Sequence, residues 1–164
     1  MTTPNEVQQI VADAGGAITG KTRLQKSAYF LEADGVGSGF DFNYHYYGPY
    51  SEELATAATD ASALGLVSLD WSHANGGFSY ATYRTAADSG DNPRTRRRQQ
   101  ILAILDRYDA VSLELAATAH FLSVNGFAKD PWAETRRRKA AKVTDERILR
   151  AKELLDEIGF VALA

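Results

Sequence analysis

The chain has no cysteine among its 164 residues, so disulfides and thiolate metal sites are excluded. Its three histidines, His45, His73 and His120, are scattered and do not form the H-x-x-x-H spacing typical of a zinc site. No G-x-S-x-G nucleophile elbow occurs, and adjacent Glu52 and Glu53 point in different directions on a helix. We therefore expect no catalytic residue, no metal and no cofactor, which predicts a non-enzymatic protein.

Long hydrophobic runs are also lacking. No apolar run approaches the roughly 18 residues that a membrane helix needs, and the opening MTTPNEVQQ has neither the basic nor the apolar region of a signal peptide. The hydrophobic share of 45% and charged share of 24% are ordinary for a soluble globular protein. We expect a cytoplasmic protein of one domain, residues 1–164, with no membrane partner, and its oligomeric state stays open.

The net charge of −3 hides an asymmetry along the chain. Residues 1–83 contain three basic and nine acidic residues, whereas residues 84–164 contain fifteen basic and twelve acidic residues. Two clusters carry most of the basic excess: Arg94, Arg96, Arg97 and Arg98, and then Arg136, Arg137, Arg138, Lys139 and Lys142. Such clusters can bind nucleic acid or other polyanions, although a solvated helix face is the commoner reason for a charge run.

A basic helix stands at the centre of the chain. Apolar residues at steps of four and three (Leu24, Ala28 and Leu31) predict a helix from Thr22 to Glu32. Three cations crowd its first turns, where the helix dipole favours anions: Lys21, Arg23 and Lys26. Either these cations form a solvated face, or a buried carboxylate, an external anion or a partner stabilises them.

An aromatic strand is predicted after this helix, from Phe40 to Tyr46, because aromatic residues alternate there with mostly polar ones. Pro49 lacks an amide hydrogen, so the strand should end at Gly48-Pro49 in a tight turn. Ser51 is a good N-cap for the next helix. The tyrosines of this stretch predict either core packing or a tyrosine-lined groove beside the basic helix: Tyr44, Tyr46, Tyr47 and Tyr50.

The remaining pattern predicts an α+β, mostly helical protein with a winged-helix-like core of three helices plus a β-hairpin in residues 1–85. The core elements are helices at 4–14, 22–32 and 51–64 and hairpin strands at 66–71 and 78–84, joined around Asn75-Gly76. A polar linker is expected at 86–94 and a C-terminal helical extension at 95–164. Its expected helices span residues 95–108, 112–124, 131–142 and 144–158.

Three short motifs carry a family resemblance: Leu24-Gln25-Lys26, Tyr47-Gly48-Pro49 and Leu64-Gly65-Leu66-Val67. With the later stretches SLELAATAHFL and VTDERILRAKELLDEIGF, the chain resembles the uncharacterised YwgA-like bacterial family. It is more distantly similar to the SocA-like antitoxin domain, also called Panacea. The resemblance implies a winged-helix-like core with helical additions. It implies no established biochemical function for the YwgA-like group, and an antitoxin-like role on a protein partner is its more distant implication.

A P-loop pattern also occurs, because residues 15–22 read GGAITGKT and match G-x-x-x-x-G-K-T. The pattern binds phosphates only between a buried strand and a helix, and the preceding segment has helical periodicity. We therefore expect a coincidental match, and an NTP-binding enzyme is the weakest alternative.

A DNA- or RNA-binding regulator is the stronger alternative. In a winged helix, the third helix, here 51–64, carries the base contacts. This helix has Glu52, Glu53 and Asp60 but no lysine or arginine, so phosphates would repel it. Nucleic acid would instead have to contact the cations of the basic helix, Lys21, Arg23 and Lys26, and the cluster formed by Arg94, Arg96, Arg97 and Arg98.

The leading hypothesis is a binding or regulatory module that acts on a protein partner. Tyrosine and arginine are enriched at protein interfaces, and cationic side chains are placed beside them here. The expected contact residues are Lys21, Arg23, Lys26, Tyr46, Tyr47 and Tyr50.

Overall fold

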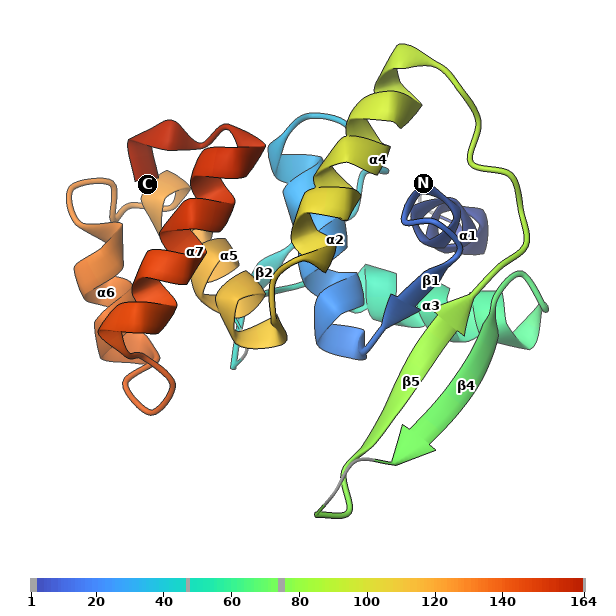
Figure 1. Ribbon diagram of the computed structural model, residues 1–164, viewed down its shortest axis with the longest axis horizontal. Helices are drawn as coiled ribbons and strands as arrows, with labels where there is room; N and C mark the ends of the chain where they lie inside the picture. The colour runs from blue at the N-terminus through green and yellow to red at the C-terminus, as the bar shows by residue number, and fades with distance from the viewer. Residues whose placement is uncertain (1–2, 47, 74–75, 164) are drawn as a thin grey trace.

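The computed structural model describes residues 3–46, 48–73 and 76–163, and shows an α+β, mostly helical protein (Figure 1). Elements in the first half are α1 (Pro4–Asp13), β1 (Ala17–Thr19), α2 (Lys21–Ala33), β2 (Asn43–His45), β3 (Gly48–Tyr50), α3 (Glu52–Ala63), β4 (Ser68–His73) and β5 (Ser79–Arg84). Those in the second half are α4 (Pro93–Asp106), α5 (Ala110–Val124), α6 (Pro131–Arg138), α7 (Asp145–Ile158) and a 3-10 turn (Val161–Leu163).

The larger sheet is antiparallel, with the strand order β1-β5-β4. β4 and β5 form the predicted hairpin, which projects away from the helices in Figure 1. Of the expected turn, Asn75 lies outside the described residues. Strand β1 was not predicted; it pairs Ala17 with Arg84 and Thr19 with Thr82, so it extends the hairpin to three strands.

The smaller sheet corrects the expected aromatic strand and Gly-Pro turn. The strand covers only Asn43–His45, and Gly48–Tyr50 forms a second strand that pairs with it antiparallel. Pro49 lies opposite Tyr44 in a two-stranded sheet, where a residue without an amide hydrogen is tolerated at an edge. The alternation holds only in part, because Phe40 is buried whereas Tyr46 is 95% exposed.

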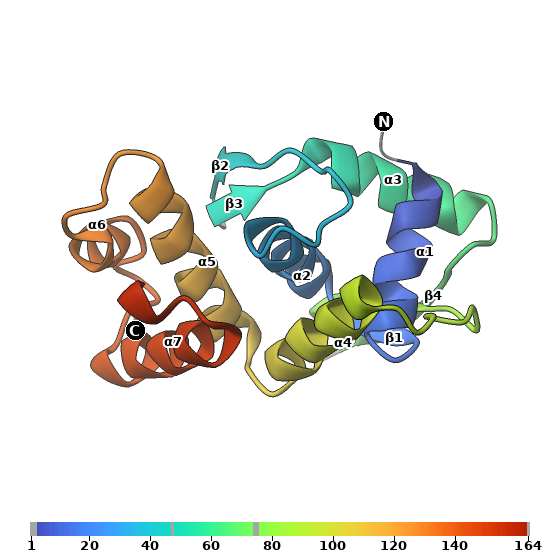
Figure 2. The same ribbon diagram turned by 90° about the horizontal axis from the view of Figure 1, so that it is seen from above.

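Helix α2 is the centre of the molecule, and every residue from Leu24 to Leu31 is buried. Figure 2 shows α2 between α5 on one side and α4 on the other. A single hydrophobic cluster includes Phe30 of α2, Ile101 of α4 and Leu115 of α5. The core therefore continues from the first 85 residues into the C-terminal helices.

Residues 86–92 contain neither helix nor strand, in agreement with the predicted linker, but α4 begins at Pro93 and includes Arg94. Asn92 caps this helix by accepting a hydrogen bond from the amide of Thr95 at 2.8 Å. Ser89 hydrogen-bonds Asp13 of α1, so the middle of the linker is held against the first helix.

Most helix ends fall within two residues of the prediction, because caps mark them. Ser51 caps α3 through the amide of Leu54 at 3.1 Å, and Thr144 caps α7 through the amide of Arg147. Helix α6 is shorter than expected: it ends at Arg138, after which Lys139 turns into the interior. No helix in the described part of the chain is both long and apolar enough to span a membrane.

Candidate functional site

The Leu-Gln-Lys motif joins α2 to the start of α3. The buried side chain of Gln25 donates to the carbonyl of Ser51 at 2.9 Å and accepts from the amide of Ser51 at 2.8 Å. Both backbone groups of a buried residue are thereby satisfied by one amide side chain. This clamp sets where α3 begins relative to α2.

Lys26 is not part of a solvated face, which was one of the alternatives for the three cations of the basic helix. Its side chain is 1% exposed, and the ammonium donates to the carbonyl of Pro49 at 2.7 Å. Burial lowers the pKa of Lys26 to about 8, because a charged amine is disfavoured away from water. In this position the ammonium of Lys26 holds the small β2–β3 sheet, and the buried side chain also forms part of the lining of the groove described below.

A buried carboxylate lies near Lys26. Such a group was one of the explanations that the sequence left open for the cations of the basic helix. Glu114 of α5 is 2% exposed and accepts from Lys142 at 2.9 Å, with the ammonium of Lys139 3.6 Å away. Lys139 also donates to the carbonyl of Tyr46, and burial lowers its pKa. Two buried lysines thus hold the two ends of the β2–β3 turn, and one glutamate balances part of their charge.

Arg23 supports the end of another helix. Its guanidinium donates to the carbonyls of Leu105 at 2.8 Å and Tyr108 at 2.5 Å, where α4 ends. A cation is favourable at the negative end of a helix dipole. Arg23 is half-buried by these contacts, so Lys21 is the most exposed of the three cations of the basic helix.

The Arg94–Arg98 cluster is divided between the interior and the surface. Arg98 is 1% exposed and donates to Asp13 at 2.6 Å and to the carbonyl of Val36 at 2.9 Å. Arg97 binds Asp34 through two nitrogens, each at 2.8 Å. Both arginines therefore make structural contacts, and a contact of this cluster with nucleic acid stays a prediction.

The other two arginines of the cluster are exposed. Arg94 donates to the carbonyl of Gly37, and Arg96 pairs with Asp91 at 2.7 Å. Exposed pairs of this kind contribute little to stability. Of this cluster, only Arg94 and Arg96 are exposed, and the guanidiniums of both already have a partner. Two such cations can neutralise few phosphates of a nucleic acid.

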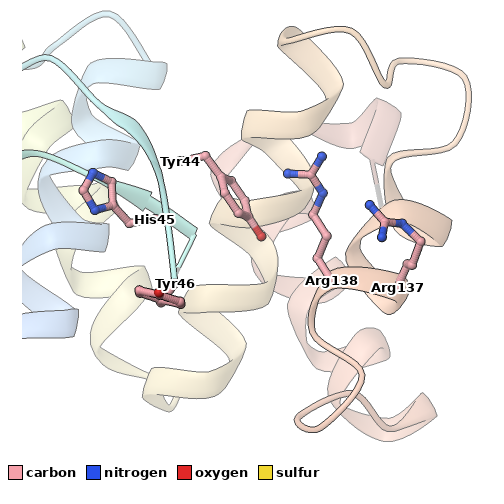
Figure 3. Close-up of a pocket in the computed structure, with 5 residues that line it drawn as sticks. All are labelled: Tyr44, His45, Tyr46, Arg137 and Arg138. Atoms are coloured by element: carbon pink, nitrogen blue, oxygen red, sulfur yellow. The ribbon is translucent and has the colours of Figure 1, made fainter.

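The predicted tyrosines are separated by the structure. Tyr46 is exposed, Tyr50 is half-buried, and Tyr47 lies outside the described residues. Tyr44, His45 and Tyr46 line a shallow pocket of about 550 Å³ with two arginines of α6 (Figure 3).

The positive charge of this shallow pocket is partly compensated by a carboxylate. Arg138 extends toward the ring of Tyr44, with 4.7 Å between the guanidinium carbon and the ring centre (Figure 3). Glu134 pairs with Arg138 at 2.7 Å and with Arg137 at 2.5 Å. Because one carboxylate serves both guanidiniums, an anion would have to compete with Glu134 here.

A deeper groove of about 780 Å³ lies between the start of α2, helix α3 and one face of the larger sheet. Its lining combines small and aromatic side chains with two cations: Lys21, Thr22, Leu24, Gln25, Lys26, Tyr50, Ala55, Ala58, Thr59, Ser62, Ala63, Leu69, Trp71 and Tyr83. Of the predicted contact residues, the groove brings together Lys21, Lys26 and Tyr50. Tyr46 and Arg23 are not part of its lining.

Trp71 is the functional candidate that the sequence reasoning missed. It lies on β4, lines the groove and is 58% exposed. The same hairpin carries Phe78 at 74% and Tyr80 at 40% exposure. The sequence signal for an exposed aromatic surface was the presence of several large aromatic residues on both sides of the Asn-Gly pair. A hairpin that projects from the helices cannot bury all of them.

The P-loop pattern lacks the geometry that its chemistry needs. Helix α1 precedes it, and β1 lies inside it and pairs antiparallel with β5. The amide of Gly20, which would face a phosphate, donates instead to the carbonyl of Ala81 at 2.8 Å. This stretch is therefore a strand that enters a helix, and its lysine, Lys21, lines the groove.

Among the described residues, no group of three or more acidic or histidine side chains is arranged to hold a metal ion. His120, the most enclosed histidine, accepts or donates a hydrogen bond with the hydroxyl of Tyr29 at 2.6 Å, and burial lowers its pKa. Comparison of the chain with protein-family models and with curated protein sequences gave no match.

Proposed function

We propose that the chain is a non-enzymatic binding module with a winged-helix-like core, and that it holds a segment of a protein partner in the groove between α2, α3 and the larger sheet. The fold part of the proposal is supported by the element order α1-β1-α2-α3-β4-β5, interrupted only by the small β2–β3 sheet, and by the strand order β1-β5-β4. The family resemblance of the motifs adds an antitoxin-like role as the broader expectation.

The observation that carries the proposal is the half-open, mostly apolar groove with an exposed tryptophan at its side. Trp71 is 58% exposed beside Leu69 and the alanines of α3. Tryptophan and tyrosine are enriched among the residues that dominate binding energy at protein interfaces. A partner side chain packed there would cover apolar surface that the chain itself leaves in water.

Electrostatics favour a polypeptide over a nucleic acid as the occupant. The exposed side of α3 carries Glu52, Glu53 and Asp60, and the helix has no basic residue. Those carboxylates would face the phosphates of a duplex that approached α3 in the manner of a winged helix. The ion pairs of Arg97 with Asp34 and of the buried Arg98 with Asp13 engage two of the cations that could offset this repulsion.

Photo-crosslinking in the native host tests the proposal directly. A photoreactive p-benzoylphenylalanine replaces Trp71 in the groove, and in a control protein it replaces Leu149, which is 63% exposed on α7. We expect a discrete crosslinked protein from position 71 that is absent from position 149. Adding Thr59→Arg should abolish this crosslink, because Thr59 lines the groove.

Thr56→Arg is the matched control, since Thr56 is an exposed threonine on the same helix but does not line the groove. It adds the same charge and should leave the crosslink intact. Identical products from positions 71 and 149, or equal loss in both threonine variants, would refute the groove as the binding site. Retention of nucleic acid alone, with a steep salt dependence, would favour the DNA- or RNA-binding alternative.

A further inference from the structure

The charged residues that line the groove have one sign. Among the residues that the structure describes, they are Lys21 and Lys26, and no aspartate or glutamate lines it. The carboxylates of α3, from Glu52, Glu53 and Asp60, lie outside the lining. Lys21 is exposed and makes no ion pair with any residue that the structure describes. Glu52 is close enough to affect the lining residue Tyr50: together with burial, which is the larger cause, it raises the pKa of Tyr50, but the side chain of Glu52 is outside the lining.

Lys26 adds to the positive character from behind the groove. Its ammonium is buried, and its carboxylate neighbour, Glu114, is shared with Lys139 and Lys142. The ammonium of Lys26 therefore places positive charge behind the groove. A charge that is shielded from water attracts a negative group more strongly than a solvated lysine does.

Next to this positive end lies an apolar floor. The row Ala55, Thr59 and Ala63 on α3 provides little side-chain bulk, and Trp71 and Leu69 face it from the sheet. The resulting volume of about 780 Å³ is enough for one or two large side chains of a partner.

We infer that the occupant of the groove is a short acidic segment of a partner protein, with a bulky apolar side chain next to an aspartate or glutamate. The apolar side chain packs on α3 beside Trp71, and the carboxylate pairs with Lys21 at the entrance. This inference rests on the proposed function and specifies the chemistry of the same site. Charge complementarity is the argument for it: a basic segment would bring like charges to Lys21 and Lys26.

Peptide selection on the full chain provides the probe. Random twelve-residue peptides displayed on phage are selected against the protein, and the recovered peptides are synthesised with a fluorescent label. Each is paired with an amide version in which every aspartate and glutamate becomes asparagine or glutamine. Binding of both versions is measured by fluorescence anisotropy at fixed salt, using the unmodified protein and the variants Lys21→Glu, Lys129→Glu, Thr59→Arg and Thr56→Arg.

We expect peptides that combine a large apolar residue with an acidic one, and an amide version that binds about tenfold more weakly, a difference of about 1.4 kcal/mol. Lys21→Glu should weaken the acidic version by at least that factor and remove its advantage over the amide version. Lys129→Glu makes the same change at an exposed lysine outside the groove and should have little effect.

The variants separate two kinds of failure. Acidic and amide versions that bind equally, but lose binding in Thr59→Arg and keep it in Thr56→Arg, would overturn the acidic-segment inference and leave the groove as the binding site. Peptides that bind Thr59→Arg as tightly as the unmodified protein would overturn both the inference and the proposed function.

Discussion

Replacing the buried Lys26 by methionine should remove a pH dependence of stability. The folded protein lowers the pKa of Lys26 from 10.5 to about 8, chiefly through burial, with Glu114 opposing the shift. Between these two values the unfolded chain binds more protons than the folded one. The free energy of unfolding therefore rises with pH in that window, and Lys26 destabilises the fold most at pH 7, where both states carry the charge.

The expected size follows from the shift. One pKa unit corresponds to about 1.4 kcal/mol, so integrating the difference in bound protons between pH 8 and pH 10 gives a rise of about 2 kcal/mol. At high pH an opposite effect occurs, because burial, with the hydrogen bond to Glu157, raises the pKa of Tyr108 to about 12. This opposite effect already starts as the pH approaches 10, where an unfolded tyrosine is half ionised. The contribution of Lys26 is therefore isolated by comparing the unmodified protein with Lys26→Met at each pH.

Urea denaturation at pH 7, 8, 9 and 10 measures this change. We expect the difference in the free energy of unfolding between the unmodified protein and Lys26→Met to change by about 2 kcal/mol between pH 8 and pH 10. Lys139, whose pKa burial also lowers, titrates in both proteins, so its contribution cancels in this difference. Lys129→Met is the exposed-lysine control and should behave like the unmodified protein. If Lys26→Met showed the same slope as the unmodified protein, the reasoning about a buried, proton-releasing lysine would be wrong.

Three further changes test individual contacts, each by its effect on the urea midpoint. Gln25→Ala should cost about 2 to 4 kcal/mol, because the buried amide and carbonyl of Ser51 both lose their partner; an unchanged midpoint would show that the clamp is dispensable. Gly48→Ala should cost about 1 to 3 kcal/mol, since Gly48 has a φ of +84° and an added Cβ would lie 2.4 Å from the hydroxyl oxygen of Thr118. Pairing it with Thr118→Ala should recover only the steric part, and complete recovery would argue against backbone strain. Burial lowers the pKa of His120 below 6.5, so the stability associated with its neutral ring should be lost as the pH falls below about 6.5. His120→Phe should reduce this loss of stability at acid pH. An equal loss in the variant would contradict the role given to His120.

The helices could be predicted because their signals are local. The apolar spacing of residues 4–14 and the caps Ser51 and Thr144 define elements that the structure reproduces closely. Strand β1 could not be found in this way: three residues between glycines show no period, and its pairing with β5 is a contact distant in sequence. The sequence of Gly48-Pro49 likewise predicts a turn and not a strand. A strand of three residues can be recognised only from its hydrogen-bonded partner strand, here Asn43–His45.

The candidate site was less accessible from the sequence. In the sequence, Lys21, Arg23 and Lys26 form one basic group. In the structure, Lys21 lines the groove, Arg23 contacts the end of α4, and Lys26 lies in the interior. What separates them is Glu114 and the end of α4, which local patterns cannot place. The role of Trp71 likewise depends on which sheet face α3 leaves open, and tertiary packing decides that.

The central position of α2 has a consequence for dividing this protein. A fragment ending near residue 85 would keep the sheet and α3 but would strip α2 of α4 and α5, turning Phe30 and its neighbours outward to water. Such a fragment should aggregate or stay unfolded, even though the break falls in a segment without helix or strand. The C-terminal helices form part of the same hydrophobic core as α2. Any fusion or truncation that keeps the groove-bearing half therefore has to include them.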